Sequence, residues 1–108
     1  MSPGREPVTI DAASAMKILQ RYVVDGRISV LPAKRTNRLV VFEWLACRFD
    51  VDRRYAEREV NEIIQRVHAD YATLRRGLYD EYFFDREEST YWRTPARQML
   101  SLIAVDGG

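Results

Sequence analysis

The fold is decided by residues 55–82, which read YAEREVNEIIQRVHADYATLRRGLYDEY. Apolar residues at helical spacing predict a helix that begins near residues 55–56. Residues 68–70 are too few for anything but a tight connection, and Asp70 is well placed to cap a second helix over residues 71–82. The stripe of the first helix consists of Val60, Ile63, Ile64 and Val67. Two helices joined by about three residues form a helix-turn-helix.

The residues before this pair predict a buried helix, a strand and a first helix. Residues 39–49, LVVFEWLACRF, are apolar on nearly every side, which is typical of a central helix buried by its neighbours. Within residues 26–38, GRISVLPAKRTNR, the apolar side chains suit a short edge strand that Pro32 stops. Residues 10–22 predict a first helix, with Asp11 as its N-cap.

The residues after the pair predict a hairpin and a last helix. Residues 83–93, FFDREESTYWR, place two aromatic-rich segments around a charged centre. Pro95 then starts a short helix that carries Met99, Leu100, Leu102 and Ile103. The chain is thus expected to be α+β and mostly α, a winged helix-turn-helix-like domain with an extra helix at each end. We expect a flexible lead-in over residues 1–9, a single domain over residues 10–104 and a disordered tail over residues 105–108.

Composition excludes several classes of protein. With 108 residues the chain has the length of one domain, and its longest apolar run, residues 39–42, is far too short for a membrane span. We therefore expect a cytoplasmic protein without a membrane contact. The chain has one cysteine and one histidine, so it offers no internal disulfide and no metal-ligand spacing. We expect neither catalysis nor a cofactor.

The single cysteine and histidine each have a plain interpretation. His68 lies near Asp70 in the tight connection, and no nucleophile accompanies it, so we read it as a solvated turn histidine. Cys47 follows Glu43 by one turn in a mostly apolar helix. The sequence therefore predicts a buried structural thiol rather than a redox sensor.

The second helix of the pair supplies candidate DNA contacts. In a DNA-reading helix-turn-helix this helix enters the major groove. At 100 degrees per residue, Thr73 and Arg76 point away from its buried side. We expect Arg76 to contact a base edge and Thr73 or Arg75 to hold phosphates. The alternative is that Arg76 pairs with Asp80 on a solvated face.

A second candidate site is the only clearly basic stretch, residues 27–38, which contains no acid. Lys34, Arg35 and Arg38 are its candidate phosphate contacts, beside a helix N-terminus near Asn37. The alternative is that the charges protect an exposed strand edge from pairing. The net charge of +1 gives no support to a nucleic-acid partner.

The predicted hairpin favours another function. Five acids stand within residues 80–88, and they would repel the phosphates that a wing normally approaches. The alternative function is a protein-interaction or dimerisation module on the same scaffold, because aromatic residues, which interfaces favour, concentrate in residues 79–92. Its partner is a second copy, through apolar residues of the terminal helices, or a separately encoded regulator.

Five blocks of the sequence carry a family resemblance. They are YVVDGRISVLPAKRTNR (22–38), FEWLACRF (42–49), YAEREVNEII (55–64), DYATLRRGL (70–78) and FFDREESTYWR (83–93). Their order and spacing resemble an uncharacterised prokaryotic domain family that occurs alone or appended to winged-helix transcription regulators of the arsenical-resistance-repressor type. One departure is Tyr79, where members often have Val. The resemblance implies a fold and a setting in transcription regulation, and it transfers no functional residue.

Overall fold

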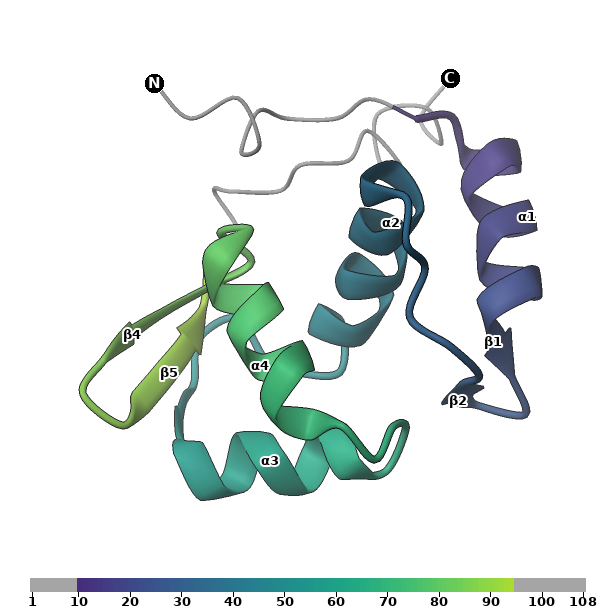
Figure 1. Ribbon diagram of the computed structural model, residues 1–108. Coiled ribbons are helices and arrows are strands. Elements are labelled where there is room, and N and C mark those ends of the chain that lie inside the picture. Colours follow the sequence, from purple (N-terminus) through teal and green to yellow (C-terminus); the bar gives the residue numbers. More distant parts are fainter. Residues whose placement is uncertain (1–9, 95–108) are drawn as a thin grey trace.

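The computed structural model describes residues 10–94, which form an α+β unit of four helices and two small antiparallel sheets (Figure 1). The predicted α+β class is confirmed. The lead-in, the tail and the helix expected after Pro95 lie outside the described residues. The elements are α1 (Ala12–Tyr22), β1 (Val23–Val24), β2 (Arg27–Ile28), α2 (Arg35–Ala46), β3 (Arg54–Ala56), α3 (Glu57–Gln65), α4 (Tyr71–Asp80), β4 (Phe84–Glu87) and β5 (Thr90–Arg93).

Helix α1 runs directly into a two-residue strand. Asp11 caps the helix as predicted, accepting a hydrogen bond from the backbone nitrogen of Ser14 at 2.7 Å. The hydrogen bond with Ser14 also holds the pKa of the Asp11 carboxyl below its ordinary value. The chain then turns at Asp25 and Gly26, whose φ angles of 54° and 77° are typical of a tight hairpin, so that β1 pairs antiparallel with β2. Strand β1 was not predicted, and β2 is shorter than the predicted strand.

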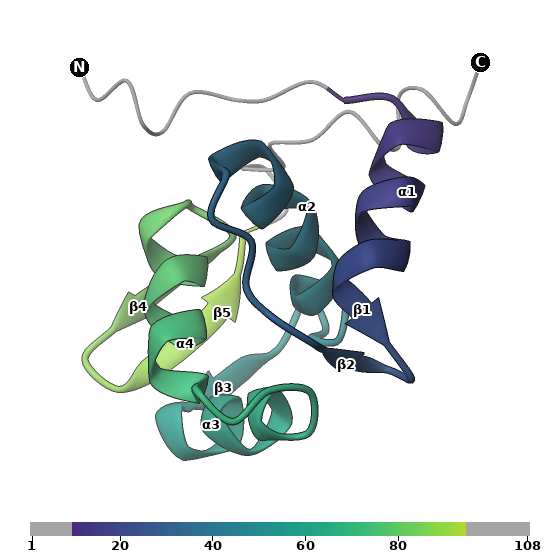
Figure 2. The ribbon, with the colours of Figure 1, turned by 45° about the vertical axis from the view of Figure 1, so that its right-hand side comes forward.

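Helix α2 lies between α1 and α4 (Figure 2). Its residues Leu39, Val40, Val41, Leu45 and Ala46 are fully buried, which confirms the predicted central helix. Its bounds differ from the predicted 39–49, because the helix begins at Arg35 and ends at Ala46. The first turn of α2, RTNR, is polar, so apolar periodicity could not indicate where the helix begins.

The larger sheet has the strand order β3-β5-β4. Strand β3 was not predicted, and residues 55–56 belong to it rather than to the start of a helix. Helix α3 begins at Glu57, since Glu59 accepts from the backbone nitrogen of Ala56 at 3.0 Å and closes the first turn. Strand β5 pairs antiparallel with β3 on one side and with β4 on the other, which confirms the predicted hairpin.

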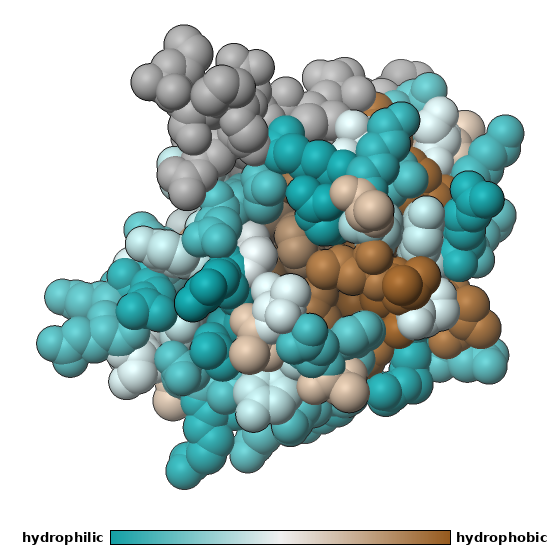
Figure 3. Space-filling model, viewed as in Figure 1, coloured by the Kyte–Doolittle hydropathy of each residue, from teal (hydrophilic) through white to brown (hydrophobic). Residues whose placement is uncertain are grey.

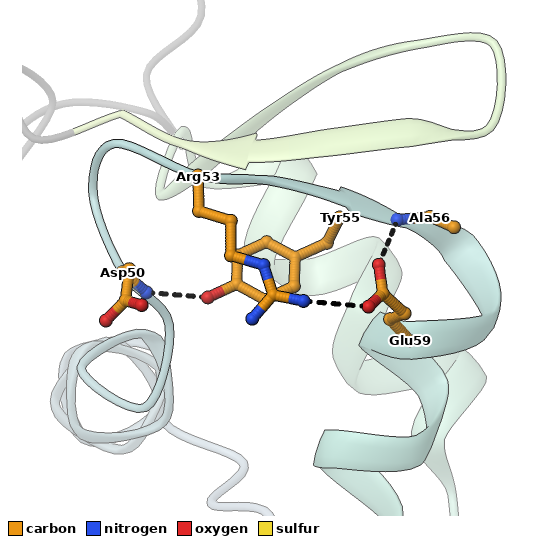
Figure 4. Close-up of polar contacts among 5 residues, drawn as sticks. All are labelled: Asp50, Arg53, Tyr55, Ala56 and Glu59. Atoms are coloured by element: carbon orange, nitrogen blue, oxygen red, sulfur yellow. Dashed lines mark hydrogen bonds and ion pairs between the residues drawn. The ribbon is translucent and has the colours of Figure 1, made fainter.

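The segment before β3 is tied to β3 and to α3 (Figure 4). The hydroxyl of Tyr55 accepts a hydrogen bond at 2.8 Å from the backbone nitrogen of Asp50. Arg53 pairs with Glu59 of α3 at 2.8 Å. The ring of Tyr55 also packs edge-on against Phe49, with 5.1 Å between centroids. These contacts hold the segment that follows α2 against β3 and the start of α3.

Helices α3 and α4 pack against each other, and α4 also packs against α2 (Figure 1). Asp70 caps α4, as predicted, by accepting from the backbone nitrogen of Thr73 at 3.4 Å. The buried faces carry Val60, Ile64, Leu74 and Leu78, each no more than 1% exposed. None of the helices formed by residues 10–94 has the length and apolar character that crossing a membrane requires.

Candidate functional site

The outer face of α4 has the predicted orientation. Ala72, Thr73, Arg76 and Asp80 are exposed, whereas Leu74 and Leu78 face the core. The alternative pairing of Arg76 with Asp80 is absent, because no ion pair or hydrogen bond among residues 10–94 involves the Arg76 side chain. Arg76 therefore presents an unpaired guanidinium to solvent from the middle of the helix.

Arg75 lies differently from its neighbour. Its guanidinium donates a hydrogen bond to the side-chain oxygen of Asn61 in α3, and it lies 3.8 Å from a carboxylate oxygen of Glu57. The Arg75 side chain is 20% exposed. Thr73, Arg75 and Arg76 nevertheless line one open hollow of about 460 Å³, together with Ala72. The structure thus places all three predicted α4 residues at one hollow. One of them, Arg75, is already bonded to α3.

The later part of the predicted basic stretch, residues 34–38, lies near the other end of α4. Arg35 forms a side-on pair with Glu81, through bonds of 2.8 and 3.2 Å, which joins the start of α2 to the end of α4. Arg38 donates to the backbone oxygen of Ala33 at 2.5 Å. Lys34 is exposed, and its ammonium forms no hydrogen bond or ion pair with another described residue. Of the three predicted phosphate contacts, only Lys34 keeps all its donors available.

The hairpin carries acidic residues at its exposed end. Asp85, Glu87 and Glu88 are exposed, and hydrophilic side chains cover this part of the molecule, at the left of Figure 3. Arg86 is exposed as well, and it pairs with Tyr91 next to the last residue pair before the turn. Its guanidinium donates to the hydroxyl of Tyr91 at 3.0 Å, and this bond, with the charges nearby, raises the pKa of Arg86 above its ordinary value.

A smaller hollow lies between the end of α4 and strand β4. Its volume is about 270 Å³. Its described lining consists of Tyr79, Asp80, Tyr82, Phe84, Asp85 and Thr94. Aromatic rings and carboxylates are therefore gathered at one place that carries no basic lining residue among those described. Such a surface favours a cation.

The prediction of a buried Cys47 is wrong. Cys47 caps the C-terminal end of α2 and is exposed, because the helix stops one residue before it. Glu43, one turn earlier, is the buried residue, at 5% exposure. Burial raises the pKa of the Glu43 carboxyl, and the nearby positive charge of Arg93 partly offsets this effect. Arg93 lies far from Glu43 in the sequence, so the spacing of residues could not predict that the two charges would be close.

His68 is half-buried and lies in the turn between α3 and α4. Its Nδ1 accepts a hydrogen bond at 2.9 Å from the backbone nitrogen of Asp70. The part of the chain that the structure describes contains no group of three or more metal-ligating side chains close enough to hold an ion. Among residues 10–94, no ion pair joins Glu62 of α3 to Arg58 or to Arg66.

Comparison with known proteins places the chain in a family without adding a function. No curated protein and no solved structure shows significant similarity to it. One family model matches residues 27–93, from strand β2 to the end of β5, and so covers more than half of the chain and both helices of the candidate site. The chain therefore belongs to the bacterial family described as "Uncharacterized protein conserved in bacteria (DUF2087)".

Proposed function

We propose that residues 35–93 form a winged helix-turn-helix domain of transcription regulation that contacts DNA weakly through α4. The order helix, strand, helix, helix, hairpin and the strand order β3-β5-β4 support this proposal. In this arrangement α3 and α4 are the helix pair, α4 is the recognition helix and the hairpin is the wing.

The observation that carries the proposal is the exposed, unpaired Arg76 beside Thr73 on the outer face of α4. A guanidinium pairs bidentately with the major-groove edge of guanine. The hydroxyl of Thr73, three residues earlier, suits a phosphate oxygen. The small side chain of Ala72, beside them on the same exposed face, lets the helix approach the groove closely.

Electrostatics limits this contact to a weak or auxiliary one. Residues 57–93 hold nine Asp and Glu against six Arg, so the helix pair and wing repel phosphates as a unit. Arg75 and Arg35 are also engaged within the protein. The expected binding therefore depends on few cations, chiefly Arg76 and Lys34, and has a shallow dependence on salt.

The experiment is fluorescence anisotropy of the full chain with a random-sequence duplex across a salt series. We expect affinity to fall with salt, and Arg76→Glu and Lys34→Glu each to weaken binding and to reduce the slope by about one. Arg21→Glu, an exposed arginine at the end of α1, is the matched control and leaves the slope unchanged. Absence of binding at low salt, or equal effects of all three substitutions, overturns the proposal.

A second candidate function is a protein-interaction module on the same scaffold. The observation that favours it is the hollow formed by Tyr79, Tyr82, Phe84, Asp80 and Asp85, whose rings and carboxylates suit a lysine or arginine side chain of a partner. A second copy of the chain is one such partner. Size-exclusion chromatography with light scattering tests self-association. A protein that stays monomeric at high concentration would exclude it.

A further inference from the structure

The hollow between α4 and β4 is built by two elements that lie side by side and by the segment that joins them (Figure 1). Tyr79 and Asp80 come from the last turn of α4, and Phe84 and Asp85 begin β4. Tyr82 lies between these elements. The volume of about 270 Å³ is below the roughly 300 to 1,000 Å³ of pockets for drug-sized ligands, so the hollow suits a single side chain.

Two of the rings that line the hollow are held in place by the fold. Phe84 is 2% exposed and packs edge-on against Phe49, with 4.8 Å between centroids. Tyr82 has a φ of 69°, in the left-handed region that favours glycine. The backbone nitrogens of Phe83 and Tyr82 donate to the last turn of α4, at 2.9 and 3.1 Å, in the pattern that usually places glycine directly after a helix. The chain therefore keeps a large ring at the wall of the hollow in spite of a strained backbone.

The charge at the hollow is negative. Asp80 and Asp85 are exposed, and neither carboxylate forms an ion pair with a described residue. The guanidinium of Arg86 lies nearby, with its Cζ 5.7 Å from the centroid of the Tyr79 ring, and it donates to the hydroxyl of Tyr91. Arg86 is not among the described lining residues. Two carboxylates thus face one cation that is already bonded, so the hollow complements a positively charged group.

We infer that this hollow binds the guanidinium of an arginine side chain that projects from a partner protein. A guanidinium is planar and weakly hydrated, so it stacks on the rings of Tyr79 and Tyr82 more readily than an ammonium does. Its fork of donors also serves the carboxylates of Asp80 and Asp85. Arg86 already lies over the Tyr79 ring, so this ring attracts a guanidinium in the folded protein. The inference rests on the second candidate function, the interaction module, and not on DNA binding.

The test is a titration of the isotope-labelled full chain, followed by the NMR chemical shifts of its backbone amides. The probes are N-acetylargininamide, N-acetyllysinamide and N-acetylcitrullinamide, of which the last has the shape of the first without its charge. At low ionic strength we expect the arginine probe to give saturable shifts at the residues that line the hollow, with a Kd in the millimolar range, as suits one side chain. We expect the lysine probe to bind about threefold more weakly and the citrulline probe about tenfold more weakly. Added salt weakens the binding of both cations.

Matched variants separate the hollow from the general acidity of the hairpin. Asp80→Asn and Asp85→Asn each raise the Kd of the arginine probe by about threefold, because each removes one charge pair. Tyr79→Leu raises it by about the same factor, because a stacking surface is lost. Glu87→Gln, at an exposed position of β4 outside the described lining, is the matched control and changes the Kd by less than about 1.5-fold. The amide spectrum of each variant shows that it is folded.

The outcomes distinguish this inference from the proposed functions. Absence of saturable shifts with the arginine probe, equal binding of the lysine or the citrulline probe, or equal effects of the Asp80, Asp85 and Glu87 substitutions overturns it. Self-association and DNA binding are measured separately. A monomer without affinity for DNA that binds the arginine probe at the hollow supports the inference, whereas a protein that self-associates but does not bind the probe contradicts the inference alone.

Discussion

Arg75 of α4 donates a hydrogen bond to the side-chain oxygen of Asn61 in α3, so an arginine predicted to contact DNA joins the two helices of the candidate helix-turn-helix. Arg76, the next residue, projects to solvent without such a bond. Adjacent residues of a helix point about 100 degrees apart. Arg75 therefore reaches α3, whereas Arg76 points to solvent, where it can contact a partner.

The two arginines are expected to differ in their effect on stability. Arg75→Ala removes a hydrogen bond and an ion pair from a half-buried place, and it lowers the free energy of unfolding by about 1 kcal/mol. Arg76→Ala removes only an exposed side chain and changes it by less than about 0.5 kcal/mol. Urea unfolding followed by circular dichroism measures both. Equal effects of the two substitutions contradict this assignment.

The pair between Arg35 and Glu81 is expected to stabilise the contact of α2 with α4. Their side chains are 26% and 14% exposed, and the two bonds are side-on, so the coupling energy exceeds that of an ordinary surface pair. A double-mutant cycle of Arg35→Ala and Glu81→Ala is expected to give a coupling of about 1 kcal/mol. If the effects of the single substitutions simply add, the pair contributes nothing.

Gly77 is expected to resist substitution although it lies within a helix. Alanine normally stabilises a helix by about 1 kcal/mol relative to glycine. At this position a Cβ would meet the ring of Phe42, which is buried and 3.0 Å away at its Cε2. Gly77→Ala therefore lowers the free energy of unfolding by about 1 to 3 kcal/mol through overpacking. Adding Phe42→Leu to Gly77→Ala is expected to recover part of the loss, whereas a stabilised Gly77→Ala would contradict the close contact.

Apolar periodicity predicted the helices well because a buried face leaves a repeated pattern. The buried faces of α3 and α4 were visible for this reason, whereas both aspartate caps and the hairpin around residues 83–93 were predicted from residue type. Strands β1 and β3 are only two and three residues long, too short for any alternation to be recognised. Their strand character depends on partners elsewhere in the chain.

The candidate site was less predictable because its residues depend on long-range partners. Nothing near Arg35 in the sequence indicated that Glu81 would engage it, and nothing near Glu43 indicated Arg93. The exposure of Cys47 follows from a helix end that differs from the predicted one by three residues. Sequence spacing thus predicted the direction of the α4 side chains. Only the tertiary fold shows which arginines are bonded within the protein and which remain open to a partner.

The last prediction concerns pH and the buried carboxyl of Glu43. Burial raises its pKa in the folded protein above the ordinary value, so the folded state holds this proton more tightly than the unfolded chain does. The stability contributed by this proton is complete below the ordinary pKa and is lost as pH rises through the raised pKa. The loss is about 1.4 kcal/mol for every pH unit that separates the two pKa values.

Replacing the carboxyl with an amide removes this titration. The free energy of unfolding of Glu43→Gln, minus that of the unchanged protein, is therefore expected to increase as pH rises from about 4 towards neutrality. Urea unfolding of both proteins at a series of pH values gives this difference, in which the titration of all other groups largely cancels. Glu88→Gln, at the exposed end of the hairpin, is the matched control for replacing a carboxyl with an amide. A flat or falling difference for Glu43→Gln would contradict the raised pKa of Glu43. It would mean that Arg93 compensates the buried charge completely. Oε1 of Glu43 and Nε of Arg93, which have no hydrogen-bond partner in the part of the chain that the structure describes, would then bond to each other when the carboxyl ionises.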